Sequence, residues 1–282
     1  MKIRDVEIGY DQPTYFIGEM SCSHLGNKAL ALELIQHAAD IGCQAIKTQM
    51  YYPADFCDSP DDPLWDFYEK WRTPTEWHPE LFNVAHGLGL AYIVSPFGNP
   101  AHIDILEGIH IDAYKVGFSE FYNVPMLERI RETGRPVIAS TGMATVGEID
   151  MFCEMFWGED QFSLLHCVSG YPTPEESLNL GKMESMIYHY GDMGVPIGLS
   201  EHTIEIKWSA HAATKGACII ERHLIKERNG ASPDNDFSLE PHEFGQLIRE
   251  VREVEAAFSQ CEYGILPCEQ EFAWRKERSK AR

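Results

Sequence analysis

Eight short apolar segments recur along the 282-residue chain, and stretches with helical periodicity separate them. Near-continuous apolar runs of this length are typical of parallel strands that are covered on both faces. Eight alternating β and α units favour a (β/α)8 TIM barrel in a single domain, with an open doubly wound sheet as the alternative. The segments expected as strands are 14–19, 44–49, 91–95, 113–117, 136–140, 163–168, 196–200 and 218–221.

The intervening stretches repeat apolar residues at i, i+3 and i+4, and several of them end in glycine, as helices do. We therefore expect residues 1–258 to form the barrel. Residues 51–72 form a connection that is long for a compact domain and rich in Pro, Asp and aromatic residues, which indicates an ordered lid. Residues 259–282 are expected to be a C-terminal tail, too short for a further domain.

Charge and composition exclude several classes of partner. The chain has 23 Lys and Arg residues against 44 Asp and Glu residues, a formal net charge of −21. This charge argues against binding to nucleic acid or to anionic lipid, which both require a basic surface. No segment approaches the roughly 18 apolar residues of a membrane helix. The N-terminus lacks the apolar core of a signal peptide. The eight cysteines are scattered without a CxxC pair, so we expect the reducing cytoplasm.

Polar side chains stand where the expected strands end, which is where TIM barrels gather their active sites. A single histidine in this position is more often a hydrogen-bonding residue than a ligand. His202 and His223 follow strands seven and eight, however, and these are neighbours in a barrel, so the two imidazoles can converge on one divalent metal ion. The strand-end residues are Glu19, Lys47, Gln49, Ser95, Lys115, Ser140, His166, Ser200, His202, Glu221 and His223.

Two of these residues, Lys47 and Lys115, are lysines that point inward from strands two positions apart. Two inward ammonium groups repel unless an anion lies between them, so we expect a phosphate or carboxylate ligand. The stretch "STGM", which begins at Ser140, could add a backbone anion cradle. As alternatives, Lys47 could extend to the barrel rim or form a Schiff base.

These stretches together resemble the sialic acid synthase (N-acetylneuraminate synthase) family, whose members condense phosphoenolpyruvate with an open-chain amino sugar. The matching segments run in family order over residues 13–258. They are "IGEMSCSHLG", "AIKTQ", "SPF", "YKVG", "STGM", "LLHCVSGYPTP", "GLSEHT", "IIERH" and "SPDNDFSLEP".

The resemblance implies roles for the strand-end residues. His202 and His223 would bind a divalent metal, usually Mn²⁺, with Mg²⁺ or Co²⁺ as alternatives. Lys47, Lys115 and Ser140 would clamp phosphoenolpyruvate, and Glu19 would face the metal and the reacting centre as a fifth catalytic residue beside the two lysines and two histidines. The expected substrate-binding residues are Gln49, Ser95, Ser119, Ser140, Ser169, Tyr171, Ser200 and Asp234, of which Tyr171 and Asp234 would hold the acceptor sugar.

The chain also departs from the family pattern. We expect it to lack the antifreeze-like domain of roughly 60 residues that usually follows in the family. Gly98 and Glu201 each stand where Asp is usual, Phe118 where Ser is common, and Ser169 where Asn is common. We therefore expect the phosphoenolpyruvate and metal elements to be kept and sugar recognition to differ. As in the family, a homodimer is expected.

Three other functions remain open from the sequence. The first is a Schiff-base aldolase that uses Lys47 or Lys115. The second is a synthase for a phosphorylated sugar, which would need additional arginines near the site. The third is a sugar-binding relative whose catalysis is altered.

Overall fold

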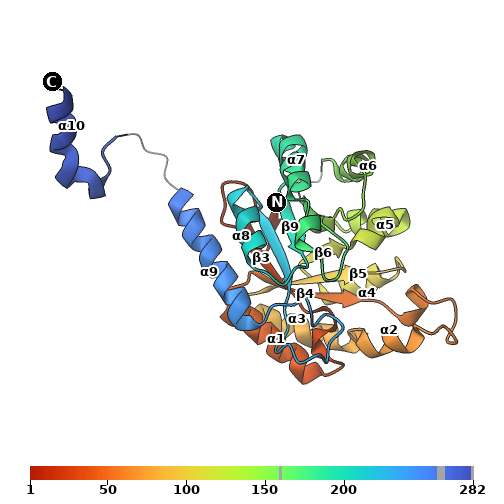
Figure 1. Cartoon of the computed structure of the whole chain (residues 1–282). Coiled ribbons are helices and arrows are strands. Elements are labelled where there is room, and N and C mark those ends of the chain that lie inside the picture. The colour runs from red at the N-terminus through yellow and green to blue at the C-terminus, as the bar shows by residue number, and fades with distance from the viewer. Residues whose placement is uncertain (159–160, 259–263, 281–282) are drawn as a thin grey trace.

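A closed barrel of parallel strands forms the centre of the molecule (Figure 1). The computed structural model describes residues 1–158, 161–258 and 264–280. Every expected strand is confirmed, with ends that differ by at most two residues from the expected bounds. The barrel strands are β3 (Tyr15–Glu19), β4 (Ala45–Met50), β5 (Ala91–Pro96), β6 (Ala113–Val116), β7 (Val137–Ser140), β8 (Phe162–Cys167), β9 (Ile197–Glu201) and β10 (Ile219–His223), and β10 pairs with β3 to close the ring.

Helices surround this barrel on its outside. Side-chain caps fix two of their starts: Asn27 accepts from the backbone N–H groups of Ala29 and Leu30, and Thr145 forms a capping box with Glu148. None of the helices in the described ranges has the length and apolar character needed to cross a bilayer. The surrounding helices are α1 (Lys28–Asp40), α3 (His78–Gly87), α4 (His102–Ile109), α5 (Val124–Glu132), α6 (Val146–Phe156), α7 (Leu180–Tyr190), α8 (Lys207–Thr214) and α9 (Pro241–Phe258).

The strands divide their side chains between two apolar layers. One set packs outward against the helices, and the other fills the lower barrel interior. Ile3 and Ile8 join the interior cluster beside Tyr15 and Ile17. Ile3 lies in, and Ile8 directly follows, an N-terminal hairpin of β1 (Lys2–Ile3) and β2 (Val6–Glu7) that the sequence did not predict. The hairpin thus closes the N-terminal end of the barrel and leaves the opposite end open.

The 51–72 segment is folded and contains the helix α2 (Trp65–Trp71). Its position is fixed by Asp55, whose Oδ2 lies 2.8 Å from Nε2 of His102 and accepts a hydrogen bond from the backbone N–H of Tyr52. A Cβ on Gly98, whose φ is +71°, would lie 2.5 Å from Cβ of Asp55. The departure at position 98 therefore has a steric reason, because Asp55 occupies the space that a side chain would need.

The expected tail contains a 3-10 turn at Pro267–Phe272 and the helix α10 (Ala273–Lys280), which lies away from the barrel in Figure 1. Its side chains are largely exposed. The rest of the expected tail, 259–263 and 281–282, lies outside the described residues.

Substituting Gly198 with alanine should weaken the barrel. An added Cβ would lie 2.6 Å from Cδ2 of Leu165 and would contact the carbonyl oxygen of Ile219. We expect Gly198→Ala to lower the free energy of unfolding by about 1–3 kcal/mol, measured by urea denaturation.

The matched control for this variant is Gly147→Ala. Gly147 lies in the exposed first turn of α6, with no atom within 4 Å of an added Cβ. Alanine there should stabilise the chain by about 0.5–1 kcal/mol. Equal unfolding midpoints for the Gly198 variant and the wild type would contradict the packing argument.

Candidate active site

A cavity of about 500 Å³ opens at the C-terminal end of the barrel. It lies where β3 to β10 present their last inward-facing side chains, above the apolar interior cluster. Ten of the expected site residues line it: Lys47, Gln49, Ser95, Lys115, Ser140, Tyr171, Ser200, His202, His223 and Asp234.

Four other expected or strand-end residues do not line this cavity. Glu19 is fully buried. Ser119 is exposed, since the 3-10 turn Phe118–Tyr122 directs Phe118 into the cavity instead. Ser169 packs against Gly142. His166 faces the helix layer, where its Nε2 lies 2.8 Å from the carbonyl oxygen of Leu178. The geometry thus gives no support to substrate contacts by Ser119 or Ser169.

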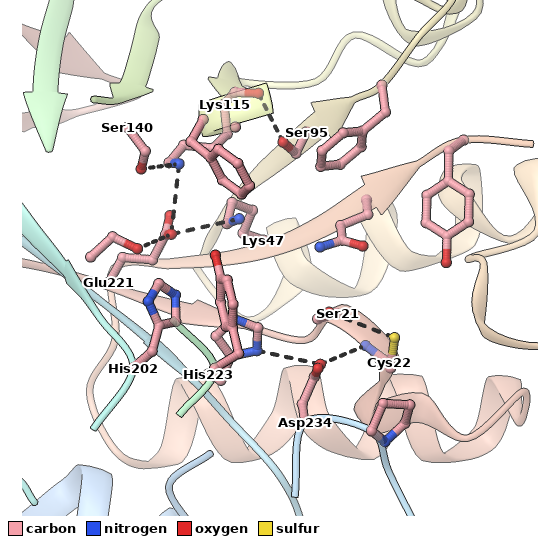
Figure 2. A pocket seen from close by; sticks show the side chains of 18 of the residues that line it. Ser21, Cys22, Lys47, Ser95, Lys115, Ser140, His202, Glu221, His223 and Asp234 are labelled. Carbon is pink, nitrogen blue, oxygen red and sulfur yellow. Dashed lines mark hydrogen bonds and ion pairs between the residues drawn. The ribbon is translucent and has the colours of Figure 1, made fainter. Parts of the chain in front are cut away.

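A carboxylate joins the two lysines at the base of the cavity. Oε1 of Glu221 lies 3.7 Å from Nζ of Lys47 and 3.7 Å from Nζ of Lys115 (Figure 2). Lys47 also pairs with Glu19, and Nζ of Lys115 donates a 2.6 Å hydrogen bond to Oγ of Ser140. The expected anion between the lysines is thus a carboxylate of the chain itself, Glu221, and their mutual repulsion does not by itself require a bound ligand.

Burial and neighbouring charge act in opposite directions on these four groups. Burial would raise the pKa of Glu221, but Lys115 and Lys47 lower it to about 2. Burial would lower the pKa of Lys47, but Glu19 and Glu221 raise it above its ordinary value. Burial lowers the pKa of Lys115, although the charge of Glu221 opposes this shift. Burial raises the pKa of Glu19, although the charge of Lys47 opposes this shift. Lys47 is therefore a firmly held cation, whereas Lys115 gives up its proton more easily.

Two imidazoles line the cavity side by side. His202 follows β9 and His223 ends β10, and their ring centroids lie 5.4 Å apart. Nδ1 of His202 is buried without a hydrogen-bond partner in the described part of the chain, whereas Nδ1 of His223 faces a carboxylate. Oδ2 of Asp234 lies 3.4 Å from Nδ1 of His223 and accepts from the backbone N–H of Cys22 (Figure 2). Burial, and then His223, lower the pKa of His202 well below its ordinary value, which leaves this ring neutral with a free lone pair. Two imidazoles on adjacent strands, with a carboxylate beside one of them, are a donor set that fits a divalent cation.

A second buried ion pair lies behind the histidines, on the side of the helices. Nη1 of Arg222 lies 2.9 Å from Oε2 of Glu201, and both side chains have zero exposure. Arg222 also donates to the carbonyl oxygen of Thr203, and Glu201 accepts from the hydroxyls of Thr203 and Ser209. The pair thus ties the chain next to His202 to the strand that carries His223. The departure at Glu201 belongs to this network and not to sugar recognition.

The sequence placed Glu221 at a strand end but assigned it no role. The alternation along β10 contains the missing signal, because Ile219, Glu221 and His223 share one face and Arg222 takes the other. The sequence indicated an ordered lid in the 51–72 segment. Three of its aromatic residues, Phe56, Phe67 and Tyr68, line the cavity, which favours that role.

Fold and cavity together define a (β/α)8-barrel enzyme whose charged groups gather at the strand ends. The NeuB family model matches residues 34–263. The pseudaminic acid synthase of Helicobacter pylori is 32% identical over 272 residues, covering 91% of this chain and 78% of that protein. The pseudaminic acid synthase of Campylobacter jejuni strain 81-176 is 33% identical over 262 residues, covering 88% and 75%. The chain belongs to the NeuB family and is a sugar acid synthase, which confirms the predicted resemblance to the sialic acid synthases.

Solved structures agree with this assignment. The N-acetylneuraminic acid (sialic acid) synthetase of Leptospira borgpetersenii superposes with a TM-score of 0.89 at 27% identity, covering 98% of this chain and 96% of that one. A truncated 3-deoxy-D-arabino-heptulosonate 7-phosphate synthase of Thermotoga maritima gives a TM-score of 0.71 at 17% identity, covering 91% and 92%, and shares the fold.

Removing Arg222 should destabilise the chain strongly. Arg222→Met leaves the carboxylate of Glu201 buried without its cation, and breaking a buried pair in this way costs about 3–5 kcal/mol. The measurement is the free energy of unfolding from urea denaturation.

The double variant Glu201→Met/Arg222→Met is the control, because it removes both charges. It should lose less stability than the sum of the two single variants. Strict additivity would show that the two side chains do not depend on one another.

Proposed function

We propose that the chain condenses phosphoenolpyruvate with an open-chain aldose, N-acetylmannosamine or a related amino sugar, to give a sialic-acid-like nonulosonate and phosphate. The observation that carries this proposal is one cavity of a NeuB-family chain that gathers two lysines, the carboxylate between them and two neighbouring histidines. Relatives named pseudaminic acid synthase and N,N'-diacetyllegionaminic acid synthase support this product class.

Phosphoenolpyruvate is proposed to bind at the base of the cavity. Lys115 and Lys47 supply positive charge there, an electrostatic role that stabilises the anion throughout the reaction. Glu221 already offsets part of this charge, so neutral donors are also needed. The hydroxyls of Ser95, Ser140 and Ser200 and the amide of Gln49 line the same cavity and can provide them.

His202 and His223 are proposed to hold the divalent metal, Mn²⁺ in the first instance, with Mg²⁺ or Co²⁺ as alternatives. A metal bound there would polarise the aldehyde oxygen as a Lewis acid and orient the acceptor. Within residues 1–158, 161–258 and 264–280 no group of three or more His, Cys, Asp or Glu side chains is arranged to hold a metal. Substrate or water oxygens would therefore complete the coordination, as in catalytic sites with open positions.

The proposed reaction makes one carbon–carbon bond. C3 of phosphoenolpyruvate attacks the aldehyde carbon, and the aldehyde oxygen takes up a proton. Water adds at C2 and loses one proton, which balances the proton taken up by the aldehyde oxygen. Phosphate then leaves with cleavage of the C2–O bond and takes the remaining hydroxyl proton, so that C2 becomes the ketone carbon.

Glu19 was expected to face the reacting centre, and we now propose a different role for it. Its carboxylate pairs with Lys47 and accepts a 2.7 Å hydrogen bond from the backbone N–H of Ser21, away from the cavity lining. Glu19 therefore acts through Lys47, by holding the ammonium group in place.

We further propose that residues 51–72 serve as the lid over this cavity, since several of their aromatic rings line it. The cytoplasmic location and the homodimer remain predictions. Each of the seven cysteines in the described ranges is free, in keeping with a reducing compartment.

One observation favours a Schiff-base aldolase as the second candidate. Burial lowers the pKa of Lys115, which makes its amine a better nucleophile. Borohydride reduction in the presence of the sugar would trap such an adduct covalently, whereas a synthase would give none.

The direct test measures phosphate released from phosphoenolpyruvate with Mn²⁺, across a panel of aldoses that includes N-acetylmannosamine, with and without chelator. We expect release that requires both the metal and an acceptor sugar. Tight binding of metal and phosphoenolpyruvate without release for any sugar would favour the sugar-binding relative.

Alanine at either cavity histidine should remove metal and activity together. For His202→Ala and His223→Ala we expect the Mn²⁺ affinity to fall by about 10-fold or more and phosphate release to fall at least as far. Isothermal titration with Mn²⁺ and the phosphate assay measure the two effects. His211→Ala, on the exposed face of α8, is the matched control and should change neither. Full metal content and rate in His202→Ala would refute the metal assignment.

A further inference from the structure

We propose that Lys182 is a positioning residue for phosphoenolpyruvate, because it holds the backbone turn that follows Ser140 and thereby fixes that side of the cavity. The inference rests on the proposed condensation and adds a residue that lies outside the cavity lining. Lys182 is half-buried in the first turn of α7 (Leu180–Tyr190).

The turn connects β7 with α6. The backbone N–H of Ala144 donates a 2.7 Å hydrogen bond to the carbonyl oxygen of Thr141, which defines a tight turn over residues 141–144. Ser140, directly before the turn, lines the cavity, and its Oγ accepts a 2.6 Å hydrogen bond from Nζ of Lys115 (Figure 2). A displacement of the turn would therefore move a hydroxyl that contacts a lysine of the proposed anion site.

The inner side of the turn packs directly against the cavity lining. Gly142 has a φ of +43°, and a Cβ there would lie 2.5 Å from Cβ of Phe118 and 3.1 Å from Oγ of Ser169. Burial raises the pKa of the Cys167 thiol, whereas Lys115 and the backbone of Gly142 oppose this rise, which places the turn against a second lining residue. The turn thus has no room to move inward.

The outer side of the turn is held by Lys182. Its Nζ donates to the carbonyl oxygen of Gly142 at 3.1 Å and to that of Ala144 at 3.2 Å. Hydrogen bonds from a charged donor are stronger than those between neutral groups. One ammonium group therefore ties two carbonyls of the same turn to α7.

The stability of α7 does not account for a lysine at this position. Lys182 is the third residue of the helix, where the helix dipole makes a positive charge unfavourable. Burial lowers the pKa of Lys182, and no carboxylate of the described residues pairs with it. The lysine thus costs the helix stability, and what it contributes is the contact with the turn.

The effect of Lys182 on phosphoenolpyruvate is indirect. Its ammonium group acts through the turn, with Phe118 and Ser169 on the inner side and Lys182 on the outer side. Ser140 is therefore in place before the anion binds. A donor fixed in advance loses little conformational entropy on binding, so its contact appears as affinity for phosphoenolpyruvate.

The experiment titrates phosphoenolpyruvate into the full chain with Mn²⁺ and without an acceptor, by isothermal titration calorimetry. Phosphate release with an acceptor then gives the KM of each substrate. For Lys182→Met we expect the affinity for phosphoenolpyruvate to fall about 10-fold and its KM to rise in proportion, as for loss of hydrogen bonds to a charged group. The Mn²⁺ affinity and the KM of the acceptor should not change. Lys182→Arg keeps the charge and the donors and should recover most of the affinity.

Lys215→Met is the matched control. Lys215 is exposed and pairs with Glu184 of α7 at 2.6 Å, so this variant removes a positive charge beside the same helix without touching the turn. It should leave every constant unchanged.

An unchanged phosphoenolpyruvate affinity in Lys182→Met would overturn the inference. Equal losses of affinity for phosphoenolpyruvate and Mn²⁺, with no recovery in Lys182→Arg, would also overturn it, because they indicate a general loss of structure. If the wild type binds phosphoenolpyruvate but releases no phosphate with any sugar, the condensation fails and the titration alone decides the inference. If the wild type does not bind phosphoenolpyruvate, both fail.

Discussion

The carboxylate of Glu221, held between the ammonium groups of Lys47 and Lys115, is the interaction on which the rest of the site depends. Unpaired charges buried at this depth would be very unfavourable, whereas alternating charges with hydrogen bonds are tolerated. Strand register creates the alternation. Glu19 stands opposite Lys47 on one side and His223 on the other, which is only true because β10 closes onto β3. The closure of the barrel therefore also fixes the arrangement of charges in the active site.

The apolar periodicity of the chain was enough to predict all eight strands, because each is a buried run bounded by helical pattern. Strand ends then located most of the site. The hairpin at Lys2–Ile3 and Val6–Glu7 escaped detection because two-residue strands are too short to show a period. The sequence also could not show which carboxylate lies between the lysines, because this depends on contacts between strands that are distant in the sequence. Ser119 was expected in the cavity lining, but a 3-10 turn directs Phe118 into the cavity instead. A turn this short leaves no periodic pattern in the sequence.

Strand ends and connections contribute different side chains to the cavity. Strand ends carry the lysines, the histidines and Glu221, and the register of a closed sheet fixes these groups relative to one another. Connections after β4 and β5 carry aromatic side chains of the lining, and connections tolerate change far better than strands. The ion pair of Glu201 with Arg222 supports this division from outside, because it braces the strand ends without entering the cavity. In the proposed reaction, the reacting end of the substrate would contact the strand ends, and its other end would contact the connections.

Gly98 and Asp55 show how such replacement is limited. The side chain of Asp55 fills the space next to Gly98, so an acidic residue at position 98 and this path of the 51–72 segment exclude one another. The two positions are 43 residues apart in the sequence (98 − 55), yet the residue at one restricts the residue at the other. In an alignment of relatives they should change together. A chimera that takes this segment alone into a chain with aspartate at position 98 would contain a clash, so the segment and position 98 have to be exchanged together.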